Sequence, residues 1–418
     1  MTRNRVVITG LGTVNPLGKS VDEFWKNCIK GSSGISKITH LFQIPEHMSQ
    51  IAGRVDLEYD SENSSASSRN QMFADMAVNE ALKQSRLFKN DEEKRECAVM
   101  ISTAIAEISV MEEMFNNHGR GEGHVDFVPL DNSYSGRSFC FNNVAQQIAQ
   151  NHGIRGKVVT ISTGCTGGND AIGYALHMIR SGKIQLAISG SVDAPITPLV
   201  VSAFSRIGAT SLRNEDPQLA SRPYDSERDG FVLAEGCGIL ILENLSHALK
   251  RGAPILAEVA GFASVNNCYH MIDIHHDGLA ISKSCKLALE DAKISANEVD
   301  FVNAHGSSTP QNDVAESHAL HRVFKERTCQ IPVTSIKSQL GHPLSAANSI
   351  ELLSAVLSMR DRKIPPTVNL CDQDPECKLN IVGNKSLDHE VNIVMKPSSG
   401  FSGIHSCVIL KECSDYER

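Results

Sequence analysis

Short apolar runs typical of strands alternate with amphipathic helical segments along this chain, and this alternation constrains the fold more than any other feature. The run at 158–162 is followed by a small-residue turn at 163–168 and by a segment at 169–180 whose apolar residues share one helical face. Residues 332–359 repeat the order of strand, turn and helix. The strand runs are apolar throughout, which is typical of sheets covered on both faces. The sequence therefore predicts a duplicated α/β architecture.

The composition is that of a large globular protein. The chain has 418 residues, of which 41% are hydrophobic, and this excludes disorder over the whole chain and favours two to three domains or one large duplicated unit. No stretch approaches the roughly 20 apolar residues of a membrane span, and we expect no signal peptide. Asp and Glu total 48 against 40 Lys and Arg, without a long basic run, so we expect neither nucleic acid nor membrane as a partner.

Twelve cysteines are scattered along the chain without a CxxC pair or a spacing typical of zinc ligands. We therefore expect no metal site. We also expect a reducing compartment, the cytoplasm, in which most thiols act as small buried apolar groups.

A glycine-rich segment, GLGTVNPLG, follows the apolar strand expected at residues 6–9, and we interpret it as a turn. It fails as a dinucleotide fingerprint because Asn15 stands where the third glycine of GxGxxG would be needed. In addition, no acidic residue ends a strand about 20 residues later. Dinucleotide binding is therefore not expected at this segment.

Cys165 differs from the other cysteines in its position. It lies among small residues, directly after a predicted strand and before a predicted helix. A thiol at a helix N-terminus is favoured as thiolate by the helix dipole and by free N–H groups, and those N–H groups can also stabilise an oxyanion. We therefore interpret Cys165 as a candidate nucleophile, with a buried structural cysteine in a tight turn as the alternative.

Two histidines occupy comparable junctions. His305 closes a predicted strand at 299–304, and His342 lies between a predicted strand at 332–337 and a predicted helix at 346–359. Ligands gather at the carboxyl ends of strands in open α/β sheets. Each histidine alone is as readily a surface or structural residue, but two histidines and one cysteine at such junctions together indicate an active site.

Two charged residues accompany the histidines. Lys337 ends the predicted strand before His342, and Glu316 lies eleven residues beyond His305. From position alone, Lys337 is either solvated or an electrostatic group of the site, and Glu316 is a helix-surface residue unless another residue pairs with it.

The combination of one cysteine with two histidines narrows the chemistry. A cysteine with one histidine suggests proteases and other acyl-transfer enzymes. Two imidazoles can in addition polarise a carbonyl and stabilise an enolate. That arrangement suits formation of a carbon–carbon bond from a thioester.

Three motifs resemble the signatures of β-ketoacyl-acyl-carrier-protein synthases. They are TGCTGG at 163–168, NAHGSST at 303–309 and KSQLGH at 337–342. Their order and spacing are those of the family, and the resemblance covers essentially the whole chain. Further stretches, such as VDAPITP at 192–198, are most similar to the ketosynthase-alpha subunit of type II polyketide synthases, whereas 213–231 is equally similar to the fatty-acid type.

The resemblance implies a thiolase fold, with duplicated α-β-α-β-α layers and two similar halves. Residues 1–255 would form the half that carries the nucleophile Cys165, and residues 256–418 the half that carries His305 and His342. Cys165 would accept the growing acyl chain as a thioester. The two histidines would assist decarboxylation of malonyl-acyl carrier protein and hold the enolate oxygen.

Supporting roles follow from the same resemblance. Lys337, paired with Glu316, would support the histidines. The backbone N–H groups of Cys165 and Phe401 would form the oxyanion hole, and Phe401 would gate the access of the acyl chain. No metal or organic cofactor is required, because the phosphopantetheine arm of an acyl carrier protein delivers both substrates.

Partners differ between the two branches of the family. A polyketide ketosynthase would form a heterodimer with a chain-length-factor-like partner, whereas a fatty-acid relative would be a homodimer. A non-catalytic partner subunit is the alternative from another class, but such subunits lack the reactive cysteine that is present here as Cys165. A degradative thiolase would carry a second catalytic cysteine near the Phe401 loop, where Cys407 is predicted to be a strand residue.

The chain departs from the family pattern at several positions. Ser402 follows Phe401 where a glycine is usual. The usual basic cluster early in the chain is reduced to Arg69, so the residues that dock the carrier protein stay open, with Arg206 and Arg213 as weaker candidates. Polyketide chain length, starter unit and final product are not specified by the sequence.

Overall fold

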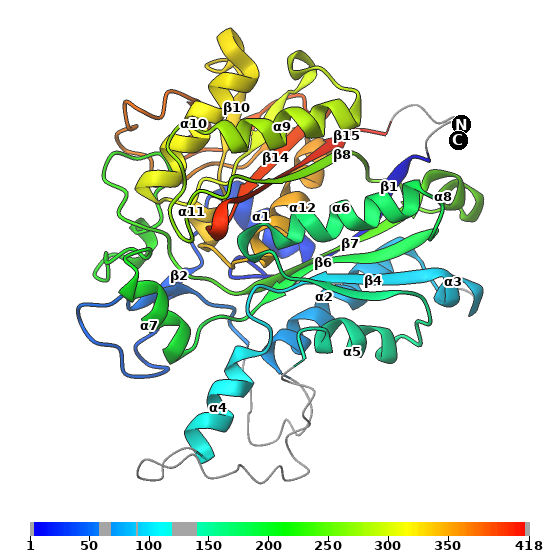
Figure 1. Ribbon diagram of the computed structural model, residues 1–418, viewed down its shortest axis with the longest axis horizontal. Coiled ribbons are helices and arrows are strands. Elements are labelled where there is room, and N and C mark those ends of the chain that lie inside the picture. Colours follow the sequence, from blue (N-terminus) through cyan, green and yellow to red (C-terminus); the bar gives the residue numbers. More distant parts are fainter. Residues whose placement is uncertain (1–3, 58–67, 89–90, 119–139, 414–418) are drawn as a thin grey trace.

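The computed structural model describes residues 4–57, 68–88, 91–118 and 140–413. Strands from both halves of the chain join in one large sheet, with helices on its faces (Figure 1). Among the residues described, no helix has both the length and the apolar character to cross a membrane.

The N-terminal part of the sheet contains the strands β1 (Val6–Val14), β4 (Cys97–Ser102), β5 (Val158–Ile161), β6 (Leu186–Asp193) and β7 (Gly236–Asn244). Their order in space is β5-β4-β6-β7-β1. β4 is parallel to β5 and β6, whereas the pairs β6–β7 and β7–β1 are antiparallel.

The C-terminal part contains the strands β8 (Ala257–Asn266), β9 (Phe301–Asn303), β10 (Pro332–Thr334), β14 (Ile393–Ser399) and β15 (Ile404–Lys411), with β12 (Asn380–Ile381) beside β10. Their order is β10-β9-β14-β15-β8. β9 is parallel to β10 and β14, and β14–β15 and β15–β8 are antiparallel. If the five strands of each part are numbered along the chain, their order across the sheet is third, second, fourth, fifth and first in both parts, apart from the added β12. The strand directions also agree, so the predicted duplication is confirmed.

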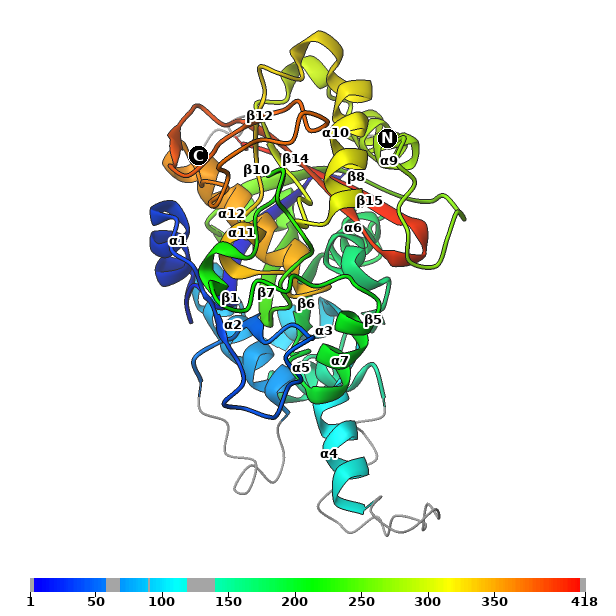
Figure 2. The same ribbon diagram turned by 90° about the vertical axis from the view of Figure 1, so that its left-hand side faces the viewer.

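The two parts meet at their first strands. β1 and β8 pair antiparallel through Val7 with Glu258 and Ile8 with Ala257. The sheet is therefore continuous rather than divided, and it folds around the helices that lie between its two parts (Figure 2).

Helices form three layers around the two parts of the sheet (Figures 1 and 2). The central layer is α6 (Gly167–Arg180) and α12 (Ala346–Asp361), the layer outside the N-terminal strands is α2 (Arg69–Ser85) and α5 (Asn143–Asn151), and the layer outside the C-terminal strands is α9 (Leu279–Ala292) and α10 (Pro310–Phe324). Alternate residues of one strand face different layers: Met100 packs with the central helices, and Val99 and Ile101 pack with α2 and α5. This arrangement confirms the expected α-β-α-β-α layers.

The remaining elements lie at the margins of these layers. They are α1 (Val21–Lys30), β2 (Ile35–Lys37), β3 (Ile51–Gly53), α3 (Asp91–Glu96), α4 (Ile108–His118), α7 (Pro198–Arg206), α8 (Leu245–Arg251), α11 (Lys337–Leu340), β11 (Lys363–Ile364) and β13 (Leu387–Asp388).

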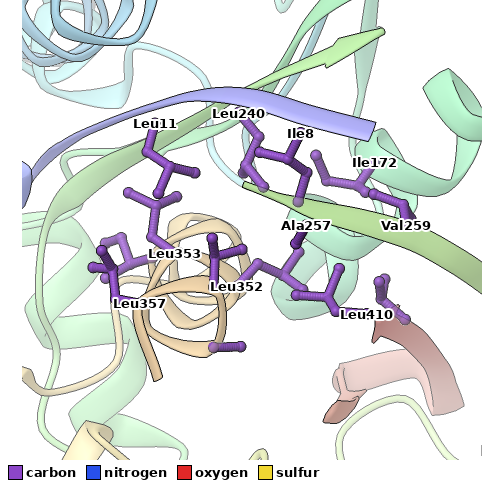
Figure 3. Close-up of a cluster of buried hydrophobic side chains, with 14 of the residues drawn as sticks. Ile8, Leu11, Ile172, Leu240, Ala257, Val259, Leu352, Leu353, Leu357 and Leu410 are labelled. Atoms are coloured by element: carbon purple, nitrogen blue, oxygen red, sulfur yellow. The ribbon is translucent and has the colours of Figure 1, made fainter. Parts of the chain in front are cut away.

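The central layer forms the largest apolar core. Leu352, Leu353 and Leu357 of α12 pack against Ile8 and other side chains from strands of both parts (Figure 3). Every residue of α12 from Ala346 to Met359 is buried. A helix that is buried on all sides needs no polar face, and its polar residues must therefore find partners inside the protein.

The glycine-rich segment after residue 9 forms the predicted turn only in its second part, where Asn15 and Gly18 exchange two backbone hydrogen bonds of 2.9 and 3.0 Å. β1 continues through the first part to Val14, because α2 packs against this strand at close range. A Cβ atom on Gly12 would lie 1.8 Å from the carbonyl oxygen of Ala77, and one on Gly10 would lie 2.3 Å from that of Ala81. The glycines permit this approach of helix to strand, which larger residues would prevent.

Candidate active site

Cys165 lies in a short 3₁₀ turn, Gly164–Thr166, between β5 and α6. Gly164 has a φ of 60°, which a glycine adopts without strain. The hydroxyl of Thr166 donates to the carboxylate of Asp170 at 2.8 Å, so the first turn of α6 is tied to the turn that carries the cysteine. The sulfur is thereby held at the N-terminus of α6, as the sequence predicts.

One cavity of about 40 Å³ brings the candidate residues together. It is lined by Cys165, Phe204, Phe231, Ile274, His305, Ser307, Thr309, Asn312, His342, Leu344, Ser399, Gly400 and Phe401. The cysteine comes from the N-terminal strands, and both histidines come from the C-terminal ones. The structure therefore places Cys165, His305, His342 and Phe401 around a single space.

The two histidines face each other. Their ring centroids are 5.3 Å apart, with an interplanar angle of 78°. His305 follows β9, and its Nδ1 atom lies 3.3 Å from the hydroxyl of Ser398, which also donates to the carbonyl oxygen of Cys165 at 3.2 Å. His342 is held by its backbone, whose N–H donates to the carbonyl of Val232 at 2.7 Å. The hydroxyl of Ser398 thus contacts both the imidazole of His305 and the backbone of Cys165.

Glu316 fixes the turn that contains His305. Its carboxylate accepts hydrogen bonds from the backbone N–H of His305 at 2.7 Å and of Gly306 at 2.8 Å, and from the hydroxyl of Tyr224 at 2.9 Å. The carboxylate is fully buried. Glu316 is therefore a structural support of the site and not the helix-surface residue considered from its position.

The prediction that Lys337 pairs with Glu316 is wrong. The ammonium of Lys337 forms its ion pair with Glu351 of α12, and it donates to the backbone carbonyl of His305 at 2.7 Å. Lys337 does not end a strand, because β10 stops at Thr334 and Lys337 begins the short helix α11. Helix α11 faces α12 at this point, whereas the carboxylate of Glu316 is already occupied by the backbone of the His305 turn. Lys337 still supports His305, but it does so directly, through a hydrogen bond to the backbone carbonyl of His305.

Burial controls the protonation of the two imidazoles. Burial lowers the pKa of His305 and of His342 well below the usual range, and the positive charge of Lys337 lowers both further. Both rings are therefore neutral at pH 7. A neutral imidazole carries one N–H donor and one acceptor nitrogen, so each ring can hold an oxyanion without a charge of its own.

Burial acts in the opposite direction on the thiol. It raises the pKa of Cys165 to about 12, and the charge of Lys337 only partly opposes this effect. Burial thus opposes the thiolate that the position at the helix N-terminus is expected to favour. The resting site contains a thiol and two neutral imidazoles.

Alkylation of Cys165 by iodoacetamide is expected to rise about tenfold per pH unit from roughly pH 7 to pH 10, because the thiolate fraction grows in that proportion below a pKa of about 12. The measurement is the mass of the peptide that contains Cys165 after timed exposure at each pH. A free cysteine peptide is the control, and its rate levels off near pH 9, the range of an ordinary thiol. A plateau for Cys165 at or below that pH would contradict the expectation.

Phe401 lies in a 3₁₀ turn, Phe401–Gly403, between β14 and β15. Its ring centroid is 6.3 Å from that of Phe204. Ser402 has a φ of 64°, the left-handed region that favours the glycine usual at this position in the resembled family. Its N–H donates to the carbonyl of Met271 at 2.7 Å, which holds the turn in this conformation.

Two further buried acidic residues belong to the site but were not predicted. Asp193, at the end of β6, accepts hydrogen bonds from the hydroxyls of Thr103 and Ser345 at 2.8 and 2.6 Å, and burial raises its pKa to about 6. Glu351 holds Lys337. A charged residue within the apolar run of α12 is the signal that could have revealed Glu351, whereas nothing in the local sequence distinguishes Asp193.

The candidates for carrier docking differ in their availability. Arg69 is largely buried and forms a bidentate ion pair with Glu235, at 2.8 Å for one of the two contacts, so it is not available at the surface. The guanidinium of Arg213 lies 3.3 Å from the carboxylate of Glu227, so it already forms an ion pair. Arg206 is exposed at the C-terminal end of α7, the helix that supplies Phe204 to the cavity. Among the residues described, no group of three or more His, Cys, Asp or Glu side chains is arranged to hold a metal ion.

Comparison with known proteins agrees with this geometry. Residues 3–248 match the N-terminal domain of beta-ketoacyl synthases, and residues 256–371 match the C-terminal domain. The chain therefore belongs to the β-ketoacyl synthase family, and its fold is the thiolase fold of ketosynthases.

Individual relatives match over nearly the whole chain. The chain is 37% identical to the tetracenomycin polyketide synthase ketoacyl synthase alpha subunit of Streptomyces glaucescens, over 98% of both chains. It is 34% identical to 3-oxoacyl-[acyl-carrier-protein] synthase 2 of a Synechocystis strain, over 99% of both.

A solved structure gives the same result. It contains a type II polyketide synthase acyl-carrier protein in complex with its ketosynthase bound to the hexaketide. The match has a TM-score of 0.92 at 41% identity and covers 99% of this chain and 100% of the other.

Proposed function

We propose that this chain is the ketosynthase subunit of a type II polyketide synthase, which extends an acyl chain by decarboxylative Claisen condensation with malonyl-acyl carrier protein. The observation that carries the proposal is the single cavity that holds Cys165, His305 and His342 in a member of the β-ketoacyl synthase family. The similarity to ketosynthase alpha subunits over 98% of the chain supports the polyketide assignment. The reaction takes place in the cytoplasm and requires no bound cofactor.

The first step is transfer of the acyl chain. The sulfur of Cys165 attacks the thioester carbonyl of the acyl carrier protein, and its proton leaves with the thiol of the phosphopantetheine arm. The backbone N–H groups of Cys165 and Phe401 hold the oxyanion. Because the thiol is protonated at rest, with a pKa of about 12, the sulfur becomes anionic only as the proton is transferred. Phe401 controls the access of the acyl chain to the sulfur.

The second step forms the carbon–carbon bond. The malonyl carboxylate leaves as carbon dioxide, and the electrons of the broken bond form an enolate on the remaining thioester. The neutral imidazoles of His305 and His342 donate N–H groups to the enolate oxygen. The enolate carbon then attacks the acyl carbonyl on Cys165, the bond between that carbonyl and the sulfur breaks, and the sulfur takes up a proton from solvent to restore the thiol. Glu316 and Lys337 keep the backbone of His305 in place during both steps.

The two halves of the chain supply different groups to the reaction. We propose that residues 1–255 act as the half that supplies the nucleophile and that residues 256–418 act as the half that supplies the imidazoles. A chain-length-factor-like subunit is the proposed partner in a heterodimer, supported by the 30% identity, at a TM-score of 0.86, to the ishigamide ketosynthase/chain length factor. The second candidate is a homodimeric fatty-acid synthase of type II, which the Synechocystis relative supports.

The test is incubation with malonylated carrier protein, with and without the candidate partner, followed by mass analysis of Cys165 and of the products. The proposal expects an acyl group on Cys165 and products of several condensations only when the partner is present. A homodimer that extends saturated acyl chains without the partner would instead support the fatty-acid candidate. No acyl group on Cys165 under either condition would contradict both.

A further inference from the structure

A second buried lysine lies beneath the two histidines. Lys396 of β14 has an exposed fraction of 0%. Its ammonium lies 2.8 Å from one carboxylate oxygen of Glu351 and donates to the carbonyl of Pro397 at 2.6 Å. The other carboxylate oxygen of Glu351 pairs with Lys337. Two ammonium groups therefore share one carboxylate, and we call these three residues the lysine–glutamate–lysine cluster.

The cluster is costly for the fold. In their ionised forms, two lysines and one glutamate leave one excess positive charge in the interior. Burial of such groups opposes folding, ion pairing recovers only part of the lost hydration, and apolar residues of similar volume often stabilise a protein better. Val394 lies two residues before Lys396 and therefore on the same face of β14, and it is an ordinary core residue, so this face of the strand accepts apolar side chains.

The connections of the cluster lead to the reacting groups. Lys337 donates to the carbonyl of His305 at 2.7 Å. Two residues beyond Lys396 on the same strand, Ser398 contacts both His305 and the carbonyl of Cys165. The backbone carbonyl of Lys396 accepts a hydrogen bond from Asn169 of α6, the helix that follows Cys165. The strand that carries Lys396 thus touches both sides of the cavity.

We propose that Lys396 is a positioning residue for the condensation reaction. Its ammonium anchors Glu351, which holds Lys337 against the carbonyl of His305. Its charge also adds positive potential to the cavity in which the malonyl carboxylate and the enolate carry negative charge. This inference rests on the function proposed above.

The charges around the histidines agree with this role. His305 is surrounded by Lys337, His342, Lys396 and His405, all of which lower its pKa, while Glu316 binds its backbone. His342 is affected by Lys337 and Lys396 in the same direction. Removing the charge of Lys396 therefore raises the pKa of both imidazoles. The protonated rings, which cannot take part as neutral donors, then form at a higher pH.

The test compares Lys396→Met with the wild type, and Lys363→Met is the matched control because Lys363 forms its ion pair with Asp388 at the surface. We expect Lys396→Met to lower kcat for condensation about tenfold or more, with little change in KM for the malonyl carrier, and to move the acidic limb of the pH–rate profile to higher pH. Loading of Cys165 should stay near the wild-type rate. The control should match the wild type in all three measurements.

A purely structural role would leave the pH–rate profile in place. A Lys396→Met profile that coincides with that of the wild type would therefore overturn the proposal, even if the variant is less stable. A wild-type protein that never acylates Cys165 would instead contradict the proposed function, so the two failures are distinguishable.

A double variant keeps the proposal testable if Lys396→Met does not fold. Glu351→Gln combined with Lys396→Met leaves Lys337 as the one buried charge of the cluster, which matches the net charge of the wild type. We expect its acidic limb to return to the wild-type position while kcat stays about tenfold low, because Lys337 has lost its anchor. A wild-type kcat in this double variant would overturn the positioning role.

Discussion

Replacement of Cys165 by alanine is expected to abolish acyl loading and to lower condensation by about 10⁴-fold or more, the order of loss seen when a covalent nucleophile is removed. The reason is positional: Cys165 is the cysteine that lines the cavity shared with both histidines. The fold should survive, because the sulfur lies in a partly apolar cluster and alanine leaves no buried polar group without a partner. The measurement is the mass of the intact protein after exposure to acylated carrier.

The control for this variant is Cys329→Ala, since Cys329 is exposed and lies outside the cavity. It should load as the wild type does. An acyl group on the Cys165→Ala protein, at any residue and at the wild-type rate, would reject the assignment of the nucleophile.

Replacement of His305 by asparagine is expected to separate the two steps. Asparagine keeps the backbone N–H that binds Glu316 but removes the imidazole that faces His342. We expect decarboxylation and condensation to fall about 10²–10⁴-fold, the usual range for loss of one acid–base or oxyanion group, while loading of Cys165 is retained. The measurements are release of carbon dioxide from malonyl carrier and the mass of the loaded protein.

His40→Asn is the matched control, because His40 is exposed and remote in sequence from the site. It should decarboxylate and condense at the wild-type rate. If His305→Asn loads poorly but decarboxylates normally, the imidazole serves acyl transfer, and the division of roles given above is wrong.

The residues of the cavity could be predicted because their signals are local. Cys165 and His305 each follow a strand closely, His342 lies between β10 and α12 just after the short helix α11, and strand ends in such sheets meet at one edge. The partner of Lys337 could not be predicted in this way. Glu316 lies on α10, before Lys337 in the chain, and Glu351 lies on α12, after it, and only the tertiary fold decides which carboxylate lies beside the ammonium.

Two other features differ from the expectation because tertiary packing determines them. The segment around Gly10 and Gly12 has the composition of a turn, but the close approach of α2 makes those glycines part of a strand. The thiol of Cys165 has the position of an activated thiolate, but the walls of the cavity remove its water and raise its pKa. The local sequence shows only the neighbours of a residue along the chain, whereas its desolvation depends on all the residues that pack around it in the fold.

The repeated strand order has a consequence for how such a site can arise. Cys165 follows β5, the third strand of the first repeat, and His342 follows β10, the third strand of the second. The two side chains thus follow corresponding strands of the two repeats, and they line the same cavity. A scaffold that is nearly symmetric therefore holds chemistry that is not, and neither copy alone would contain a complete reaction centre.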